Sequence, residues 1–274
     1  MLLQFPKTFE PGLNVLLKAA RHPEINMDFA ALVIGTGETY EAPAEKESVA
    51  VLCSGEVTVT LCGRTETLTR SDVFYGEPVV IHVPDGTTFA LTGVAERSEL
   101  LIVSTANARP FEPEIMRAAD CLNPAEIRGV GVMNDAAVRE TRTYMDRQNR
   151  PETNLFIGEV VMAPGKWSSF PPHSHRETEI YFYKFLPENG YGFAEVDRTV
   201  HRVKQHALTV MSHSEGHAQV TAPAYAEWYL WCIRLQDDAP LVSQFLPEHD
   251  WANSPDARLY PDLQPGESPV PSVR

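Results

Sequence analysis

The sequence predicts an all-β protein built from two barrel-like lobes, and three observations support this. Short segments that alternate apolar and polar residues recur along most of the chain, which is the pattern of half-buried β-strands. The 22 prolines and 16 glycines indicate frequent turns between these segments. The segments form two groups of similar length. We therefore expect an N-terminal lobe over residues 1–106, a linker over 107–150, a second lobe over 151–246 and a Pro-rich tail over 247–274.

The first group of strands begins near Met27. Residues 48–63 alternate around a central Ser-Gly pair, which predicts a hairpin with one buried face. Residues 72–93 predict two more strands, separated by a Pro-Asp-Gly turn, and the run LLIVSTA at residues 100–106 closes the lobe. We expect this lobe to bind no metal, because its His82 stands alone and a lone strand histidine is more often structural.

The second group of strands follows a stretch of different composition. Residues 107–150 are rich in Pro, Arg and Asp and lack sustained alternation, so we expect a linker with one short strand. Alternation resumes at residues 155–165. It continues through the segments EIYFYKFL, GYGFAEVD, LTVM, HAQVTAP and EWYLWCIRL. The tail from Pro247 is too broken by prolines and acidic turns for a core.

Charge and hydropathy exclude two classes of partner. A formal net charge of -14 argues against nucleic acid, because phosphate backbones are bound by clustered Lys and Arg. No stretch is apolar for the 18 or so residues that span a bilayer, and the four cysteines are scattered, so we expect a cytoplasmic location. An anionic small-molecule substrate would need a local cationic pocket to overcome the negative surface.

The informative motif is a pair of histidines followed by a glutamate. His173 and His175 are two residues apart on a predicted strand, so both imidazoles face one side. Glu179 follows four residues later, and His217 comes after a glycine at the start of a later strand. Three histidines and one carboxylate suit one divalent metal ion (zinc, manganese, iron, cobalt or nickel) and leave coordination positions open for water or substrate.

Other interpretations of these residues remain open. A single His-x-His on a strand is more often a hydrogen-bonding pair than a metal site. His213 is the rival of His217, although the Gly-His turn before a strand favours His217. Glu177 is the rival of Glu179, and it could instead support a histidine or transfer a proton.

Several stretches resemble the 5-deoxy-glucuronate isomerases of myo-inositol catabolism, a bicupin family related to the 5-keto-4-deoxyuronate isomerases. The specific motifs are WSSFPPHSH and PENGYGF, supported by GHAQVTAPAYAEWYLW, RGVGVMNDAAVRE and SDVFYGEPVVIHVPDGTTF, over about residues 49–235. The resemblance implies two double-stranded β-helix (jelly-roll) barrels, the first without metal, and a possible homo-oligomer. It places the metal ligands at His173, His175, Glu179 and His217.

This resemblance also implies a reaction, in which an aldose sugar acid becomes a ketose: 5-deoxy-D-glucuronate becomes 5-dehydro-2-deoxy-D-gluconate. The step moves a proton between adjacent carbons through an enediol, so it needs stabilisation of an oxyanion and a proton carrier. The candidates for proton transfer are Glu177, Tyr181 and Tyr183. The candidates for binding the substrate carboxylate are Arg176, Lys184 and Lys166.

The loop after the second histidine differs from that of the family. The family usually has an acidic residue after the second histidine and a longer loop before the glutamate, whereas here Arg176 stands there and the loop is short. This difference favours a related uronate as an alternative substrate.

Two functions other than isomerisation also remain open. The same ligand set could instead hold iron in a dioxygenase, which would consume oxygen, and a non-enzymatic binding protein is a third interpretation.

Overall fold

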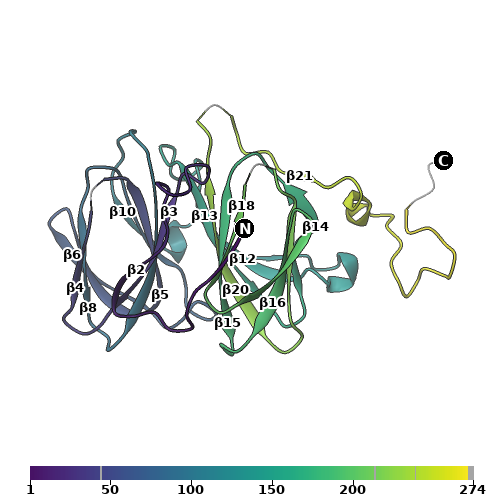
Figure 1. The fold of residues 1–274 in the computed structure, drawn as a ribbon, viewed down its shortest axis with the longest axis horizontal. Helices are drawn as coiled ribbons and strands as arrows, with labels where there is room; N and C mark the ends of the chain where they lie inside the picture. Colours follow the sequence, from purple (N-terminus) through teal and green to yellow (C-terminus); the bar gives the residue numbers. More distant parts are fainter. Residues whose placement is uncertain (44, 213, 238, 271–274) are drawn as a thin grey trace.

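The computed structural model describes residues 1–43, 45–212, 214–237 and 239–270 and is all-β, as expected. Figure 1 shows two β lobes side by side, with the C-terminal segment extending beyond the second. The helices are short 3-10 turns, η1 (Ala118–Asp120), η2 (Met133–Asp135) and η3 (Asp250–Asn253). In the described part of the chain, no helix is long and apolar enough to cross a membrane.

The first lobe is a nine-stranded sheet that folds on itself, with the path β10-β7-β5-β9-β3-β2 and with β4, β6 and β8 attached through β5 and β8. Its strands are β2 (Gly12–Leu17), β3 (Asp28–Ile34), β4 (Thr39–Ala42), β5 (Glu47–Leu61), β6 (Arg64–Arg70), β7 (Val79–Val83), β8 (Phe89–Gly93), β9 (Ser98–Thr105) and β10 (Glu114–Arg117). The turn expected between β7 and β8 and the closing strand β9 are confirmed.

The hairpin expected within residues 48–63 is wrong, because β5 runs through this segment as one strand of 15 residues. The pairing of β5 with β9 shifts register between Leu52 and Ser54, so a β-bulge bends the strand there. Gly55 has φ +101°, and a Cβ at this position would lie 2.5 Å from Ser98 Oγ. The glycine therefore allows β5 to pass from its pairing with β7 to its pairing with β8.

The second lobe has two sheets, one in the order β1-β18-β15-β20-β13-β12-β11 and one in the order β17-β16-β19-β14-β21. Its strands are β1 (Leu2–Gln4), β11 (Asn123–Arg128), β12 (Arg139–Met145), β13 (Leu155–Met162), β14 (Trp167–Ser174), β15 (Glu179–Leu186), β16 (Tyr191–Val196), β17 (Thr199–Lys204), β18 (Ala207–Met211), β19 (His217–Thr221), β20 (Ala226–Arg234) and β21 (Gln244–Phe245).

Two segments lie in sheets that the sequence pattern did not predict. The N-terminal strand β1 pairs with β18, so the chain starts in the second lobe and not in the first. The expected linker, residues 107–150, carries three strands and not one: β10 extends the first lobe, whereas β11 and β12 extend the larger sheet of the second. The division of the chain into lobes by residue number stays a prediction.

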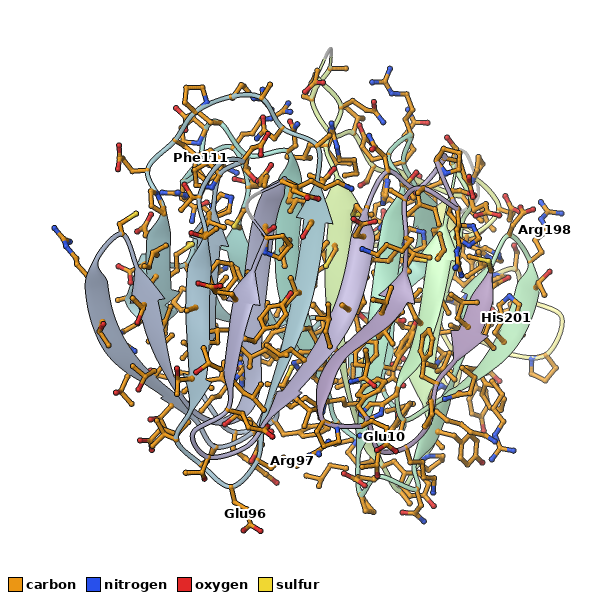
Figure 2. All side chains as sticks on the ribbon, turned by 60° about the vertical axis from the view of Figure 1, so that its left-hand side comes forward. Glu10, Glu96, Arg97, Phe111, Arg198 and His201 are labelled. Carbon is orange, nitrogen blue, oxygen red and sulfur yellow. The ribbon has the colours of Figure 1, made fainter. Side chains whose placement is uncertain are left out.

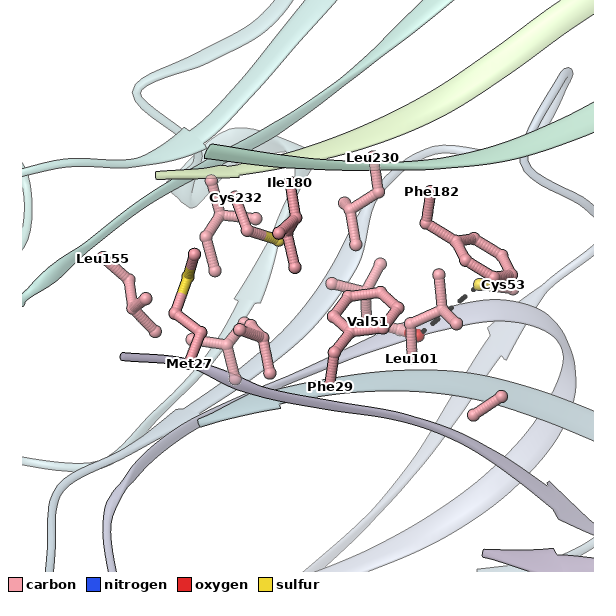
Figure 3. Close-up of a cluster of buried hydrophobic side chains, with 14 of the residues drawn as sticks. Met27, Phe29, Val51, Cys53, Leu101, Leu155, Ile180, Phe182, Leu230 and Cys232 are labelled. Atoms are coloured by element: carbon pink, nitrogen blue, oxygen red, sulfur yellow. Dashed lines mark hydrogen bonds between the residues drawn. The ribbon is translucent and has the colours of Figure 1, made fainter. Parts of the chain in front are cut away.

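The two lobes share one apolar core, in which alternation along β15 sends every second residue toward the first lobe. Figure 3 shows this core. It includes Met27, Phe29, Val51 and Leu101 of the first lobe with Ile180, Phe182, Leu230 and Cys232 of the second. The opposite face of β15 carries Glu179, Tyr181 and Tyr183, so packing between the lobes fixes the strand that presents them.

A buried ionic cluster lies beside this core. Both lobes contribute to it: Glu159 Oε1 accepts hydrogen bonds from Arg70 Nη2 at 2.6 Å and from Arg142 Nη1 at 2.8 Å. Its other oxygen accepts hydrogen bonds from Trp228 Nε1 at 2.9 Å and from the Tyr144 hydroxyl. The Glu159 side chain is fully buried, and these donors compensate its charge.

Replacing Glu159 with Gln is expected to lower the free energy of unfolding by about 3 to 5 kcal/mol, because two guanidinium groups would lose their buried counter-charge. Urea unfolding measures the effect. Glu140→Gln is the matched control, since Glu140 pairs with the same Arg142 at a side chain that is 31% exposed. The control should cost about 0 to 1 kcal/mol, and equal losses in the two variants would contradict the assigned role.

Candidate metal centre

Three strands of the second lobe bring the predicted ligands together. His173 is near the end of β14 and faces His217 at the start of β19 in the register of these two strands. His175 follows β14 directly, and Glu179 is the first residue of β15. Candidate ligand atoms of the three histidines all lie within 4.8 Å of one another. Glu179 Oε2 lies 3.0 Å from His175 Nε2 and 3.2 Å from His217 Nε2, so the four side chains converge.

Backbone carbonyls orient two of the imidazoles. His175 Nδ1 donates to Glu177 O at 3.0 Å, and His217 Nδ1 donates to Glu215 O at 3.1 Å. A neutral imidazole that donates through Nδ1 has an unprotonated Nε2, which is an acceptor. Both Nε2 atoms point at the Glu179 carboxylate, and His217 Nε2 has no hydrogen-bond partner among the described residues. Three acceptors that face one another fit a bound cation, so the donor set suits a metal.

The electrostatics of the cluster agree with this interpretation. Burial alone would raise the pKa of Glu179, but the imidazoles of His175 and His217 beside its carboxylate lower it to about 2. Burial, followed by repulsion from His217, lowers the pKa of His173 to about 4. Burial would also lower the pKa of His175, yet the Glu179 carboxylate raises it above its ordinary value. At neutral pH Glu179 is ionised and His173 is neutral, which are the forms that bind metal.

The cluster opens into a cavity of about 490 Å³ between the two sheets. His173, His175 and Glu179 line it together with Tyr181 and Tyr229. The segment after β20 covers it, because Leu241, Ser243 and Phe245, together with Asn253 of the tail, also belong to the lining, and β21 pairs with β14 at His173. The size and the polar ligand end suit a small molecule.

Of the candidates for proton transfer, only Tyr181 lines the cavity. Its ring centre lies 5.7 Å from that of His217. Tyr183 shares this face but donates to Gln219 Oε1 at 2.8 Å, away from the cavity. Glu177 is buried behind His175, whose Nδ1 bonds its backbone oxygen. Glu177 therefore supports the orientation of His175, and the structure does not bring its carboxylate into the cavity lining.

None of the three cations expected to bind the substrate carboxylate lines the cavity. Lys184 points to the opposite face of β15, where its Nζ lies 2.6 Å from Glu99 Oε1 of the first lobe. Its position differs by an odd number of residues from Glu179, and alternation therefore turns it away. Lys166 is partly exposed and donates to Asp135 O at 2.8 Å. Arg176 is exposed in the loop before β15, outside the lining.

The sequence-based prediction missed other lining residues. Arg128 and Arg139 belong to the segment interpreted as a linker, and Tyr229 belongs to a strand to which no role was given. The alternation of β12 was the available signal, but it is short and places polar residues on its cavity side. His213, the rival ligand, lies outside the described residues.

Comparisons with known proteins agree with this fold and site. The model of the KduI/IolB family matches residues 6–252. The 5-deoxy-glucuronate isomerase of Halalkalibacterium halodurans is 28% identical over 247 residues, which cover 82% of this chain and 87% of that protein. The 5-deoxy-glucuronate isomerase of Bacillus subtilis strain 168 is 25% identical over 226 residues, which cover 74% of this chain and 79% of that protein.

Solved structures show the same architecture. An IolB-like protein from Salmonella typhimurium LT2 superposes with a TM-score of 0.76 at 17% identity, over 92% of this chain and 99% of that one. An oxalate decarboxylase variant from Bacillus subtilis gives a TM-score of 0.64 at 14% identity, over 90% of this chain and 79% of that one. The predicted fold of two jelly-roll cupin barrels is confirmed.

Removing one imidazole is expected to abolish most metal binding. His173→Ala and His217→Ala should each lose most of the metal found in the purified wild type, while far-ultraviolet circular dichroism stays unchanged. His201→Ala is the matched control, because His201 lies on β17 at the outer edge of the second lobe (Figure 2). Elemental analysis measures the metal, and full occupancy in the two cluster variants would refute the site.

Metal affinity is expected to fall as the pH is lowered to about 6.5, the ordinary pKa of histidine, and below. Glu179 raises the pKa of His175 above that ordinary value, so His175 carries a proton there, and that proton must leave before the metal binds. Calorimetric titration of metal-free protein with Zn²⁺ in buffers of different ionisation enthalpy should show proton release near the lower pH. Affinity that is independent of pH would contradict this coupling.

Proposed function

This chain belongs to the KduI/IolB family, and we propose that it is a metal-dependent isomerase that converts 5-deoxy-D-glucuronate to 5-dehydro-2-deoxy-D-gluconate in myo-inositol catabolism. Relatives that carry the name 5-deoxy-glucuronate isomerase support the substrate. One observation of the structure carries the chemistry: the cluster of three histidines and Glu179 at a cavity of about 490 Å³.

Four side chains of this chain hold the metal in the proposed enzyme: His173, His175, Glu179 and His217. The metal is one divalent ion of the group zinc, manganese, iron, cobalt and nickel, which accept nitrogen and oxygen ligands. When bound, it supplies a Lewis acid that polarises the aldehyde carbonyl and stabilises negative charge on the substrate oxygens. The protein contributes the orientation of the imidazoles and a cavity with aromatic side chains in its walls.

Tyr181 is the group proposed to move a proton at a substrate oxygen. Burial, followed by the charge of Glu179, raises its pKa well above 10, so its hydroxyl is protonated at neutral pH. A protonated hydroxyl in the cavity can donate to an oxygen atom that becomes negative as the enediol forms. The neighbouring ring of Tyr229, with its centre 4.7 Å from that of Tyr181, packs against it and limits its movement.

The experiment that tests the function uses protein purified without chelator. Nuclear magnetic resonance would follow 5-deoxy-glucuronate, and an oxygen electrode would follow the same sample. Conversion of the aldehyde to a ketone, lost on treatment with chelator and restored by metal, is the expected result. Oxygen uptake without isomerisation would instead favour the dioxygenase, and conversion of another uronate alone would change the substrate.

Tyr181→Phe is expected to lower kcat by about 100-fold or more, with the metal content unchanged, because the substrate oxygen would lose its proton donor. Tyr183→Phe is the matched control on the same face of β15. Its hydroxyl contacts Thr209 and Gln219 and does not line the cavity, so kcat should change little. A larger loss in Tyr183→Phe than in Tyr181→Phe would contradict the assignment.

A further inference from the structure

One part of the cavity wall carries positive charge, and this charge comes from residues outside the metal cluster. Arg128 and Arg139 line it, and no Lys and no further Arg of the described residues does so. The chain has a formal net charge of -14, so its overall field repels an anionic ligand. Two guanidinium groups at one cavity therefore form the local attraction that an acidic ligand needs.

Alternation along β12 explains why Arg139 points inward. Arg139 and Thr141 face the cavity, whereas Arg142 on the other face belongs to the ionic cluster around Glu159. Arg128 of β11 is the direct cross-strand neighbour of Arg139. The ionic cluster thus fixes the strand from behind, which holds the arginine pair in position.

The two arginines differ in their hydrogen-bond partners. Arg128 donates to Glu126 Oε2 at 2.8 Å through Nε and at 2.6 Å through Nη2, and its side chain is 45% exposed. Arg139 donates through Nη1 to Ala137 O at 2.8 Å. Within the described ranges, Arg139 forms no ion pair within 4.0 Å, although its charge helps to lower the pKa of Glu126 after the larger effect of Arg128.

Arg139 lines the same cavity as the aromatic side chain of Tyr229. Burial raises the pKa of Tyr229 to about 12, and the positive charge of Arg139 is the largest influence that opposes this rise. Arg139 is therefore electrostatically close to Tyr229, whose ring packs on Tyr181 at the metal end. The cavity thus connects the arginine to the cluster.

Thr141 adds an unpaired polar atom between the two ends. It is 3% exposed, it lines the cavity, and its Oγ1 has no hydrogen-bond partner among the residues that the structure describes. Burying a hydroxyl without a partner costs stability, so such groups are commonly paired when a ligand binds. A hydroxyl of a sugar would satisfy it.

Arg139 and the metal cluster lie at different places on the wall of one cavity. Three steps between neighbouring strands separate β15, which carries Glu179, from β12, which carries Arg139. The register adds an offset along the strands, because Arg139 pairs with Met162, Met162 pairs with Glu227 and Glu227 pairs with Phe185, which follows Glu179 by six residues. A polyhydroxylated chain with a carboxylate at the end away from the metal is therefore the kind of ligand that suits both groups.

We infer that Arg139, assisted by Arg128, binds the carboxylate of a sugar-acid substrate, and that Thr141 binds one of its hydroxyl groups. This inference rests on the proposed function, because it names the residues that select an acid over a neutral sugar at the same site. It replaces Arg176, Lys184 and Lys166, which the cavity lining does not include. Arg139 is a specificity residue and takes no part in proton transfer.

The test compares two ligands that differ only at the far end, D-glucuronate and D-glucose, by calorimetric titration of the metal-loaded protein. Wild type should bind glucuronate more tightly than glucose. Arg139→Gln should weaken glucuronate binding about 10- to 100-fold and leave glucose binding unchanged. Arg139→Lys should give an intermediate loss, because it keeps the charge but not the two-pronged geometry.

Arg64→Gln is the matched control. Arg64 is an exposed residue of β6 in the first lobe, and the substitution removes the same charge. It should leave binding of both ligands unchanged. Equal weakening of glucuronate in Arg64→Gln and Arg139→Gln, equal weakening of both ligands by Arg139→Gln, or no preference for glucuronate in wild type would overturn the inference.

Thr141→Val tests the hydroxyl contact by itself, because valine keeps the shape of threonine. Both ligands should weaken by a similar factor, and unchanged binding of both would overturn this part. Failure of the inference is distinguishable from failure of the proposed function. If glucuronate binding depends on Arg139 but 5-deoxy-glucuronate is not isomerised, the carboxylate site stands and the proposed reaction fails.

Discussion

The alternation of β15 is the constraint on which the rest of the structure depends. One face of this strand, with Ile180 and Phe182, belongs to the apolar core shared by the two lobes. The other face begins with Glu179 and continues with Tyr181 into the cavity. The strand cannot shift by one residue without burying a carboxylate in the shared core, so packing between the lobes sets the register of the metal site. The first lobe thus contributes to function without contributing a ligand.

Some buried polar groups of this protein have hydrogen-bond partners, and others lack them among the described residues. Where the lobes meet, Glu159 is surrounded by donors from both, and the cluster adds rigidity to β12 and β13. Around the cavity, in contrast, His217 Nε2 and Thr141 Oγ1 are buried without a partner in the described part of the chain. Buried polar groups of that kind are costly, and a metal at the first and a polar ligand at the second would satisfy them.

Local pattern in the sequence was sufficient for the all-β class, for most strands of the second lobe and for the convergence of His173, His175, Glu179 and His217. It was insufficient for segments whose structure depends on the strand with which they pair. The segment around Gly55 was predicted as a hairpin but is one strand with a bulge. The sequence could not distinguish the two, because a glycine next to a serine fits a turn and a bulge equally well. The polar cavity face of β12 conceals its alternation, so Arg139 was interpreted as part of a linker. Lys184 could have been excluded from sequence, since alternation places it opposite Glu179.

A crystal structure of the metal-loaded protein, with anomalous diffraction recorded at the absorption edge of the metal that elemental analysis identifies, tests the central claim most directly. The account predicts one anomalous peak in the second lobe, at about 2.0 to 2.3 Å from nitrogen atoms of His173, His175 and His217 and from an oxygen of Glu179. A peak elsewhere, or a metal held without Glu179 and His217, would contradict it.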